Sequence, residues 1–220
     1  MALNRKETAW RKNRRFGEIH GGRSKRKVPD SILRRVHSLP PPADGAELPQ
    51  FIIDNPSRQF AFPIVESQIR KALGRLPYSD TARITHVWLR RVSMASYRAG
   101  RVPFAQFLCG RGARIIVLYP WPTDMLLRFG RRRPMARLLR EYSPWTEDLV
   151  LVEERWCLRW TMDALRAFYL NHLLLHEVGH HVDWYYRRWT EANRRQTEEA
   201  ADQYAVYWSK RAPKQYHDRT

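Results

Sequence analysis

The sequence predicts an α+β fold, in which a small mixed sheet packs against two long helices at the C-terminal end. Two patterns carry this prediction. Apolar stretches of strand length lie in the middle of the chain, whereas residues 161–210 repeat apolar side chains at helical spacing. In addition, 43% of the 220 residues are hydrophobic, which is enough to form one sizeable core.

The N-terminal segment is expected to be a disordered, basic tail. Residues 1–48 contain the runs RKNRR, RSKRK and LRR, and they end in SLPPPADG. A segment with few apolar and many charged residues buries too little surface to offset the entropy lost on ordering. We therefore predict two parts, a flexible tail over residues 1–48 and one folded domain over residues 49–220.

The first half of the domain is predicted to contain one helix and two strands. Residues 63–76 have apolar side chains at helical spacing and begin with a proline, which suits a first helical turn. Residues 84–94 alternate in the manner of a strand, and residues 113–122 form a second, more apolar strand that ends in prolines. Residues 101–112 are expected to be an irregular connection between these two strands.

The second half is predicted to be mainly helical. The stretch RFGRRRP leads into a short basic helix after Pro134, and residues 149–156 read as a third strand. One long helix is expected over residues 161–189 and a second over residues 191–210. This order, with strands in the middle and two helices at the end, gives the α+β class.

The strong excess of positive charge indicates which kinds of molecule the protein could bind. The formal net charge is +18, carried mostly by arginine. Such an excess favours contact with polyanions, namely nucleic acid, an anionic membrane surface or an acidic partner, for which the basic tail is the candidate contact. A basic, solvated surface with no such partner explains the charge equally well, so charge alone does not assign a function.

The cysteine content and the apolar runs of the sequence indicate the cellular compartment. Cys109 and Cys157 lie far apart and form no C-x-x-C pair, which favours a reduced, cytoplasmic protein. The N-terminal residues lack the apolar core of a secretory signal. No run approaches the ~18 apolar residues needed to cross a bilayer, so no membrane span is expected.

A short motif in the first long helix suggests chemistry. His176, Glu177 and His180 spell H-E-x-x-H. Positions i and i+4 of a helix share one face, so the two imidazoles can reach one metal ion, and Glu177 is displaced far enough to act on a water. In that arrangement zinc lowers the pKa of the water and Glu177 takes its proton. The alternative is that both histidines are polar positions on an ordinary amphipathic helix.

A second motif supplies the third donor that a catalytic zinc site requires. Glu198 and Asp202 lie four residues apart on the second helix and share a face. Glu198 is the candidate third ligand, and Asp202 is the candidate hydrogen-bond partner that orients a ligand histidine. The small pair Ala200 and Ala201 would let the two helices approach closely, and Gly179 removes a side chain next to His180. An exposed acidic patch that balances nearby arginines is the alternative explanation.

Several assignments around the motifs stay open. Glu199 is adjacent to Glu198 and competes with it as third ligand, although the four-residue step to Asp202 favours Glu198. Asp183 follows His180 by three residues and is a weaker candidate ligand. His181 is expected to be a neighbouring surface or packing histidine rather than a ligand, and His172 extends the histidine row and could line the cleft.

The two motifs in this order resemble the gluzincin zinc metallopeptidases, in particular their compact members. The resemblance covers about thirty residues, His176–His180 and Glu198–Ala205. It implies Zn²⁺ as cofactor, His176, His180 and Glu198 as ligands, and Glu177 as general base. It also implies a sheet whose edge strand pairs with an extended peptide, for which residues 113–120 are the candidate.

A further group is expected to stabilise the negative charge that develops on the substrate during hydrolysis. A tyrosine or histidine often does this in such sites. Tyr204, Tyr207 and His217 are the available candidates, and the sequence does not rank them.

Two functions of different kinds follow from these patterns. The first is a metalloprotease, a zinc-dependent hydrolase acting on a peptide or protein substrate. The second is a basic nucleic-acid-associated protein in which the site formed by the two motifs is structural or inactive. In that case the stretches RSKRK, RFGRRRP and RRVS would contact phosphates.

Overall fold

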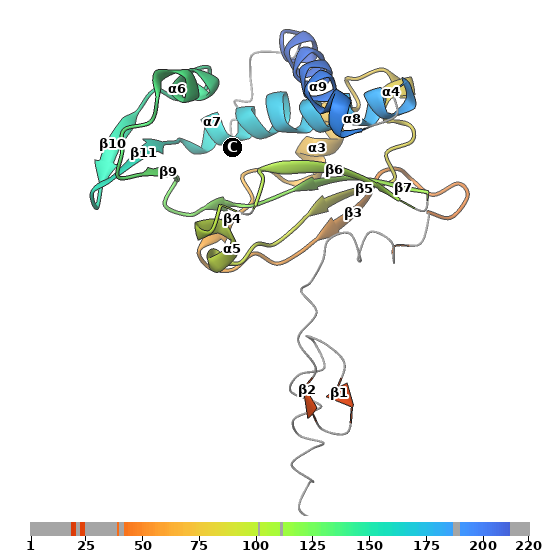
Figure 1. The fold of residues 1–220 in the computed structure, drawn as a ribbon. Coiled ribbons are helices and arrows are strands. Elements are labelled where there is room, and N and C mark those ends of the chain that lie inside the picture. The colour runs from red at the N-terminus through yellow and green to blue at the C-terminus, as the bar shows by residue number, and fades with distance from the viewer. Residues whose placement is uncertain are drawn as a thin grey trace, which may run out of the picture.

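The computed structural model describes residues 19–20, 23–24, 39, 42–100, 102–110, 112–186 and 190–211. The predicted tail, residues 1–48, lies mostly outside these ranges; within it, β1 (Ile19–His20) pairs antiparallel with β2 (Arg23–Ser24). From residue 42 onwards, helices gather on one side of a sheet, as Figure 1 shows. This arrangement of segregated helices and strands confirms the predicted α+β class.

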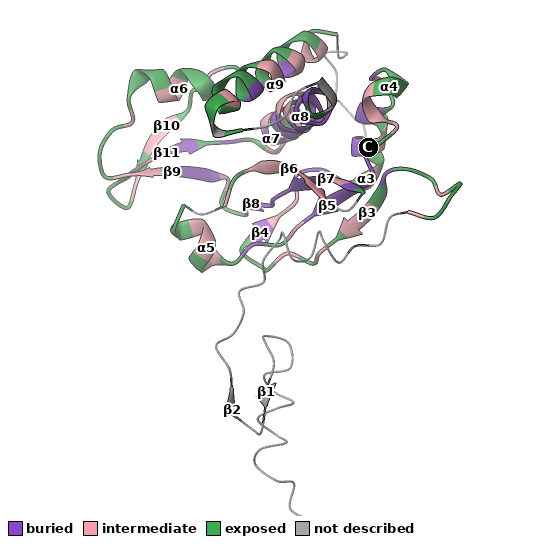
Figure 2. Cartoon of the chain, turned by 45° about the vertical axis from the view of Figure 1, so that its right-hand side comes forward, coloured by how far each residue is buried: buried purple, intermediate pink, exposed green. Residues whose placement is uncertain are grey.

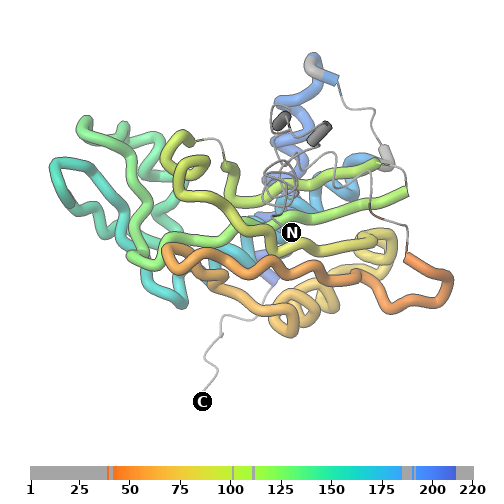
Figure 3. The backbone as a smooth tube through the Cα atoms, turned by 90° about the horizontal axis from the view of Figure 1, so that it is seen from below, coloured from red at the N-terminus to blue at the C-terminus, as the bar shows by residue number. Residues whose placement is uncertain are grey.

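The main sheet has four strands in the spatial order β3-β5-β7-β6. Their bounds are β3 Gln50–Ile53, β5 His86–Leu89, β6 Ala105–Gly110 and β7 Ala113–Leu118. Strands β3, β5 and β7 are parallel, whereas β6 runs antiparallel to β7, so the sheet is mixed. Seen from below, the strands lie side by side with β3 at one border (Figure 3). Strand β6 forms the opposite border.

A layer of helices covers one face of this sheet. Its members are α3 (Glu66–Leu73), α4 (Tyr78–Thr81), α7 (Met162–Phe168), α8 (Leu174–Tyr186) and α9 (Arg194–Ser209). Apolar residues of β5 and β7, among them Val87 and Ile116, share one buried cluster with Leu174 and Val178 of α8. Most of α8 as far as Asp183 is buried and is purple in Figure 2, whereas Trp184 near its end is exposed. The sheet therefore fixes the position of the helix that carries H-E-x-x-H.

A second, smaller sheet extends the molecule to one side. Its strands are β9 (Leu126–Gly130), β10 (Leu149–Val152) and β11 (Arg155–Arg159), in the order β10-β11-β9, and α6 (Ala136–Tyr142) lies beside them in Figure 1. The short pair β4 (Phe60–Ala61) and β8 (Trp121–Pro122) precedes it, and a five-residue helix, α5 (Met94–Arg98), follows β5.

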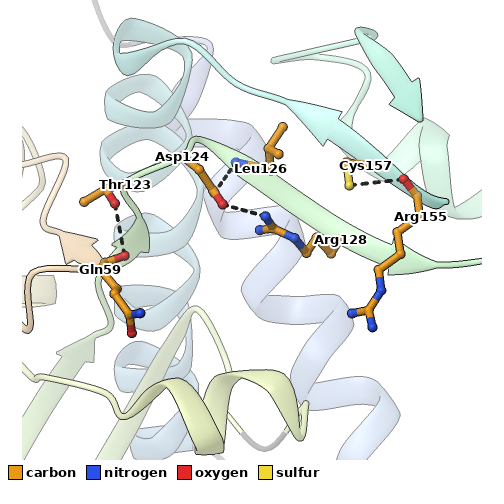
Figure 4. A network of polar contacts seen from close by, with 7 residues as sticks. All are labelled: Gln59, Thr123, Asp124, Leu126, Arg128, Arg155 and Cys157. Carbon is orange, nitrogen blue, oxygen red and sulfur yellow. Dashed lines mark hydrogen bonds and ion pairs between the residues drawn. The ribbon is translucent and has the colours of Figure 1, made fainter. Parts of the chain in front are cut away.

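Side-chain hydrogen bonds fix the turn between the two sheets. Asp124 accepts from the backbone N–H of Leu126 at 3.1 Å and from the Arg128 guanidinium at 2.6 Å, and Thr123 binds the Gln59 carbonyl (Figure 4). These bonds give β9 a defined starting direction after β8.

Three strand predictions need correction. Residues 105–110, expected to be irregular, form β6, because β7 offers them a complete antiparallel partner. The predicted single strand over 149–156 is a hairpin, since Glu153 and Glu154 both adopt positive φ (48° and 59°) and reverse the chain between β10 and β11. The predicted substrate-pairing edge, residues 113–120, is wrong as well: β7 lies inside the sheet, and the edge on that side is β6.

The long helices largely follow the prediction. The stretch predicted as one helix over 161–189 begins at α7, capped by the Thr161 side chain, which accepts from the Ala164 N–H. It continues through a π-helical turn, Tyr169–Leu173, into α8. A short 3₁₀ turn, Glu191–Asn193, opens the second helix before α9. The π turn shifts the register of the helix just before His176.

Candidate metal centre

Three predicted donors converge between α8 and α9. His176 and His180 lie one turn apart on α8, and Glu198 faces them from the second turn of α9. One ligand atom from each residue lies within 4.8 Å of the other two. The Nε2 atoms of His176 and His180 are 3.4 and 3.5 Å from the Glu198 Oε2 atom.

These distances fit the donor set of a tetrahedral metal ion. Zinc binds histidine nitrogen at about 2.0–2.1 Å, which makes the separation of two donors around a tetrahedral ion about 3.3–3.4 Å. The two nitrogen–oxygen distances, 3.4 and 3.5 Å, are close to that edge length. The imidazole rings of His176 and His180 are perpendicular, at 89°, so both nitrogens can point at one position. Two imidazoles and one carboxylate are a common donor set for catalytic zinc.

The neighbouring carboxylates are distinguished by their contacts. Asp202 Oδ1 lies 2.9 Å from His176 Nδ1, the ring nitrogen that faces away from Glu198. Glu199 instead accepts a hydrogen bond from Arg195 at 2.7 Å, one turn back on the same helix. The structure therefore brings Glu198 and Asp202 to the histidines, and it directs Glu199 elsewhere.

Glu177 is a buried carboxylate beside these donors. Only 5% of its surface is exposed. The pKa of Glu177 is raised to about 8, chiefly by burial; a hydrogen bond from the Phe107 backbone N–H lowers it, and the charge of Glu198 makes a smaller contribution to the rise. Burial also lowers the pKa of His180, which favours the neutral imidazole that a metal requires.

The donors open onto a cavity of about 610 Å³. Strand β6 supplies one wall through Ala105, Gln106 and Phe107, and α8 and α9 supply the other through the motif residues, Arg194 and Thr197. The backbone of β6 is oriented for this role. Tyr119 donates its N–H to the Phe104 carbonyl, so alternate residues from Ala105 onwards direct their N–H and C=O groups away from β7 and towards the open border.

Gly179 allows the two helices to meet. A Cβ atom at this position would lie 2.8 Å from the Ala201 Cα atom and 3.0 Å from the Tyr204 Cβ atom. Thr197, Ala201 and Ala205 are the buried residues of α9 and form one stripe at four-residue spacing. The missing side chain of Gly179 thus sets the separation of α8 and α9. Of the predicted small pair, Ala201 makes the close contact.

The other predicted residues lie away from the donors. The Tyr204 hydroxyl donates to Asp80 at 2.8 Å, and the exposed Tyr207 ring packs against the Arg211 guanidinium. Neither tyrosine lines the cavity, and His217 lies outside the described residues. The transition-state role predicted for these three residues stays a prediction.

The remaining acidic and histidine candidates also have distinct surroundings. His181 is fully buried and meets the Phe107 ring edge-on, and burial lowers its pKa to about 4. His172 stacks on Phe168 rather than lining the cavity. Asp183 is buried and is absent from the donor group found among the described residues.

Some cavity residues were not anticipated from the sequence. Phe107 contributes its backbone N–H to Glu177, a contact that carries no side-chain signature. Arg194 and Thr197 precede Glu198 by four residues and one residue, so the third-ligand assignment could have pointed to this turn of α9.

No protein-family model, no curated protein and no solved structure matches this chain. Among the described helices, none combines the length and apolar character needed to span a bilayer.

Proposed function

We propose that this protein is a zinc-dependent metallopeptidase, a hydrolase acting on peptide bonds. One observation carries the proposal: two histidine nitrogens and the Glu198 carboxylate converge at tetrahedral spacing beside a buried second carboxylate, Glu177. The resemblance to gluzincins assigns the same four residues the same roles. A cytoplasmic location remains a prediction from the sequence.

The residues divide the chemistry among them. When bound, zinc supplies a Lewis acid that polarises the scissile carbonyl and lowers the pKa of a water. Glu177 accepts the proton of the attacking water and later delivers it to the leaving amine. Burial raises the pKa of Glu177 in the metal-free protein, a bound cation would favour its ionised form, and the Phe107 N–H holds the carboxylate in place.

Asp202 orients a ligand. Its carboxylate accepts a hydrogen bond from His176 Nδ1, which leaves the lone pair of Nε2 directed at the metal position. Without this partner the His176 ring could carry its proton on Nε2, and metal binding would first require a change of tautomer.

The open border of β6 supports an extended peptide as substrate. Ala105 and Phe107 lie beside the donors, and the backbone groups on this side of β6 point away from β7. The Phe107 N–H is already donated to Glu177, so a peptide that adds to this border would form its main-chain hydrogen bonds with the other outward-facing groups of β6 as it passes the metal position. Main-chain recognition implies broad sequence tolerance, with preference set by the side chains that enter the cavity.

Paired measurements of zinc content and peptide hydrolysis test the proposal. We expect the wild-type protein to bind zinc and to cleave an unfolded protein such as casein. Glu177→Gln should keep its zinc and lose hydrolysis, because the amide cannot accept the proton. Glu199→Gln is the matched control and should behave as wild type, since Glu199 pairs with Arg195. A zinc-loaded wild type with no hydrolysis, or an active Glu177→Gln, would contradict the proposal.

Polyanion binding is a second candidate function, supported by one surface feature. The connection between β9 and α6 exposes Arg131, Arg132 and Arg133, and the Arg133 guanidinium lies over the Trp156 ring. Retention on immobilised DNA or RNA should then fall steeply with salt and should weaken when these arginines are replaced. Retention that is unaffected by either change would exclude this surface.

A further inference from the structure

The third donor, Glu198, lies on α9, a helix with few fully buried residues. Only Thr197, Ala201 and Ala205 of α9 are buried, and all three have small side chains. The Glu198 side chain itself is 51% exposed. Partly buried Tyr204 and Trp208 of α9 also pack against the main core, and the small side chains against Gly179 permit close approach of the two helices.

One directional contact supplements this packing. The Cβ atom of Tyr204 lies next to Gly179 of α8. The hydroxyl of the same side chain donates a hydrogen bond to Asp80 Oδ2 at 2.8 Å. Asp80 belongs to α4, which also packs against α8. The second oxygen of this carboxylate accepts from the Ser79 hydroxyl at 3.0 Å. Tyr204 therefore links α9 to α4, and both of these helices pack against the helix that carries the two histidines.

We propose that Tyr204 and Asp80 form a positioning pair that holds α9 in the register required for metal binding. The inference rests on the proposed metal centre and deepens it. Glu198 and Asp202 precede Tyr204 by six and two residues on one rigid helix, so a rotation or slide of α9 moves both carboxylates relative to the histidines. Because the pair fixes this register before the ion arrives, binding need not supply the ordering free energy. Tyr204 thus acts at a distance from the reacting atoms.

Metal affinity measured by competition with a chromophoric chelator tests this role. Tyr204→Phe removes only the hydroxyl, and we expect zinc to bind about tenfold more weakly, which corresponds to about 1.4 kcal/mol. Tyr78→Phe is the matched control: it is the same substitution on α4, at a side chain that is 83% exposed, and it should leave zinc affinity unchanged. Circular dichroism verifies that both variants are folded.

Cobalt substitution separates positioning from general stability. The visible absorption of bound Co²⁺ reports the geometry of its donors, and we expect a changed band shape in Tyr204→Phe but not in Tyr78→Phe. Asp80→Asn keeps an oxygen acceptor for the Tyr204 hydroxyl and should retain more affinity than Asp80→Ala. Because the two residues act as one unit, the double variant Tyr204→Phe/Asp80→Ala should bind zinc no more weakly than Asp80→Ala alone.

The outcomes distinguish this inference from the proposed function. If the wild type binds no zinc, the metal centre and the positioning pair both fail. If the wild type binds zinc tightly and Tyr204→Phe has the same affinity and the same cobalt spectrum, the metal centre stands and the positioning pair is refuted. Should Tyr204→Phe fold poorly, the comparison of Asp80→Asn with Asp80→Ala decides alone, and equal affinities would refute the pair.

Discussion

The close contact at Gly179 makes a sharp prediction about Gly179→Ala. The added Cβ atom would lie 2.8 Å from the Ala201 Cα atom, 3.0 Å from the Tyr204 Cβ atom and 3.1 Å from the Ala201 carbonyl oxygen. Two of these three atoms belong to the backbone of α9, which cannot move aside by changing a rotamer. The helices must separate to admit the methyl group.

Two opposing effects set the size of the change. Alanine is favoured over glycine inside a helix by about 1 kcal/mol. Overpacking of a close interface costs about 1–3 kcal/mol, and rigid backbone neighbours place this site at the upper end. The expected net result is a loss of about 2 kcal/mol, which lowers the melting temperature of a chain this long by about 4–8 °C. Because Glu198 moves outward with α9, zinc affinity should fall as well.

Thermal unfolding followed by circular dichroism, with and without zinc, measures both effects. Gly74→Ala is a suitable control, since Gly74 ends α3 with an ordinary helical φ of −65° and its nearest contact would be 3.3 Å, to the Arg70 carbonyl oxygen. We expect that control to change stability by less than about 1 kcal/mol. A Gly179→Ala protein that melts at a higher temperature than wild type would refute the close packing of α8 on α9.

Three further predictions concern single side chains. Asp202→Ala should weaken zinc binding about 10–100-fold through loss of the His176 contact, as measured by chelator competition, and unchanged affinity would remove that role. In metal-free protein, the Glu177 pKa is raised from 4.5 to about 8, so its contribution to stability is complete below pH 4.5 and is lost as the pH rises through 8. Glu177→Gln should therefore abolish the decline in melting temperature between pH 4.5 and about 8, and an identical decline in both proteins would show that another group causes it. The His181 pKa is lowered from 6.5 to about 4, so its contribution is lost as the pH falls through that interval. His181→Leu should flatten the acid side of the same profile, whereas an unaltered slope would contradict the burial of a neutral imidazole.

The sequence predicted those parts of the candidate site that depend on helix geometry. The four-residue steps from His176 to His180 and from Glu198 to Asp202 place each pair on one helix face, whatever the rest of the chain does. The preference for Glu198 over Glu199 rested on the same step, and Arg195 adds an independent reason because it pairs with Glu199 one turn away.

The strand at the border of the cavity could not be predicted in this way. Residues 105–110 include Gln106, Cys109 and Gly110 and show weak strand character by themselves, and they become β6 only through pairing with β7. The hairpin turn at Glu153 and Glu154 lacks the glycine or asparagine that usually marks positive φ, so two strands appeared as one. Contacts between distant segments, such as the Phe107 N–H on Glu177 or Asp80 on Tyr204, leave no local pattern to detect.

The zinc content of purified protein tests the central claim most directly. We predict stoichiometric zinc in the wild type and in Glu199→Ala, and loss of zinc in Glu198→Ala, with all three proteins folded by circular dichroism. Adjacent glutamates on one helix make this pair of variants closely matched in charge and helix propensity. Full zinc occupancy in Glu198→Ala, or a wild type that takes up none from zinc-containing buffer, would contradict the account.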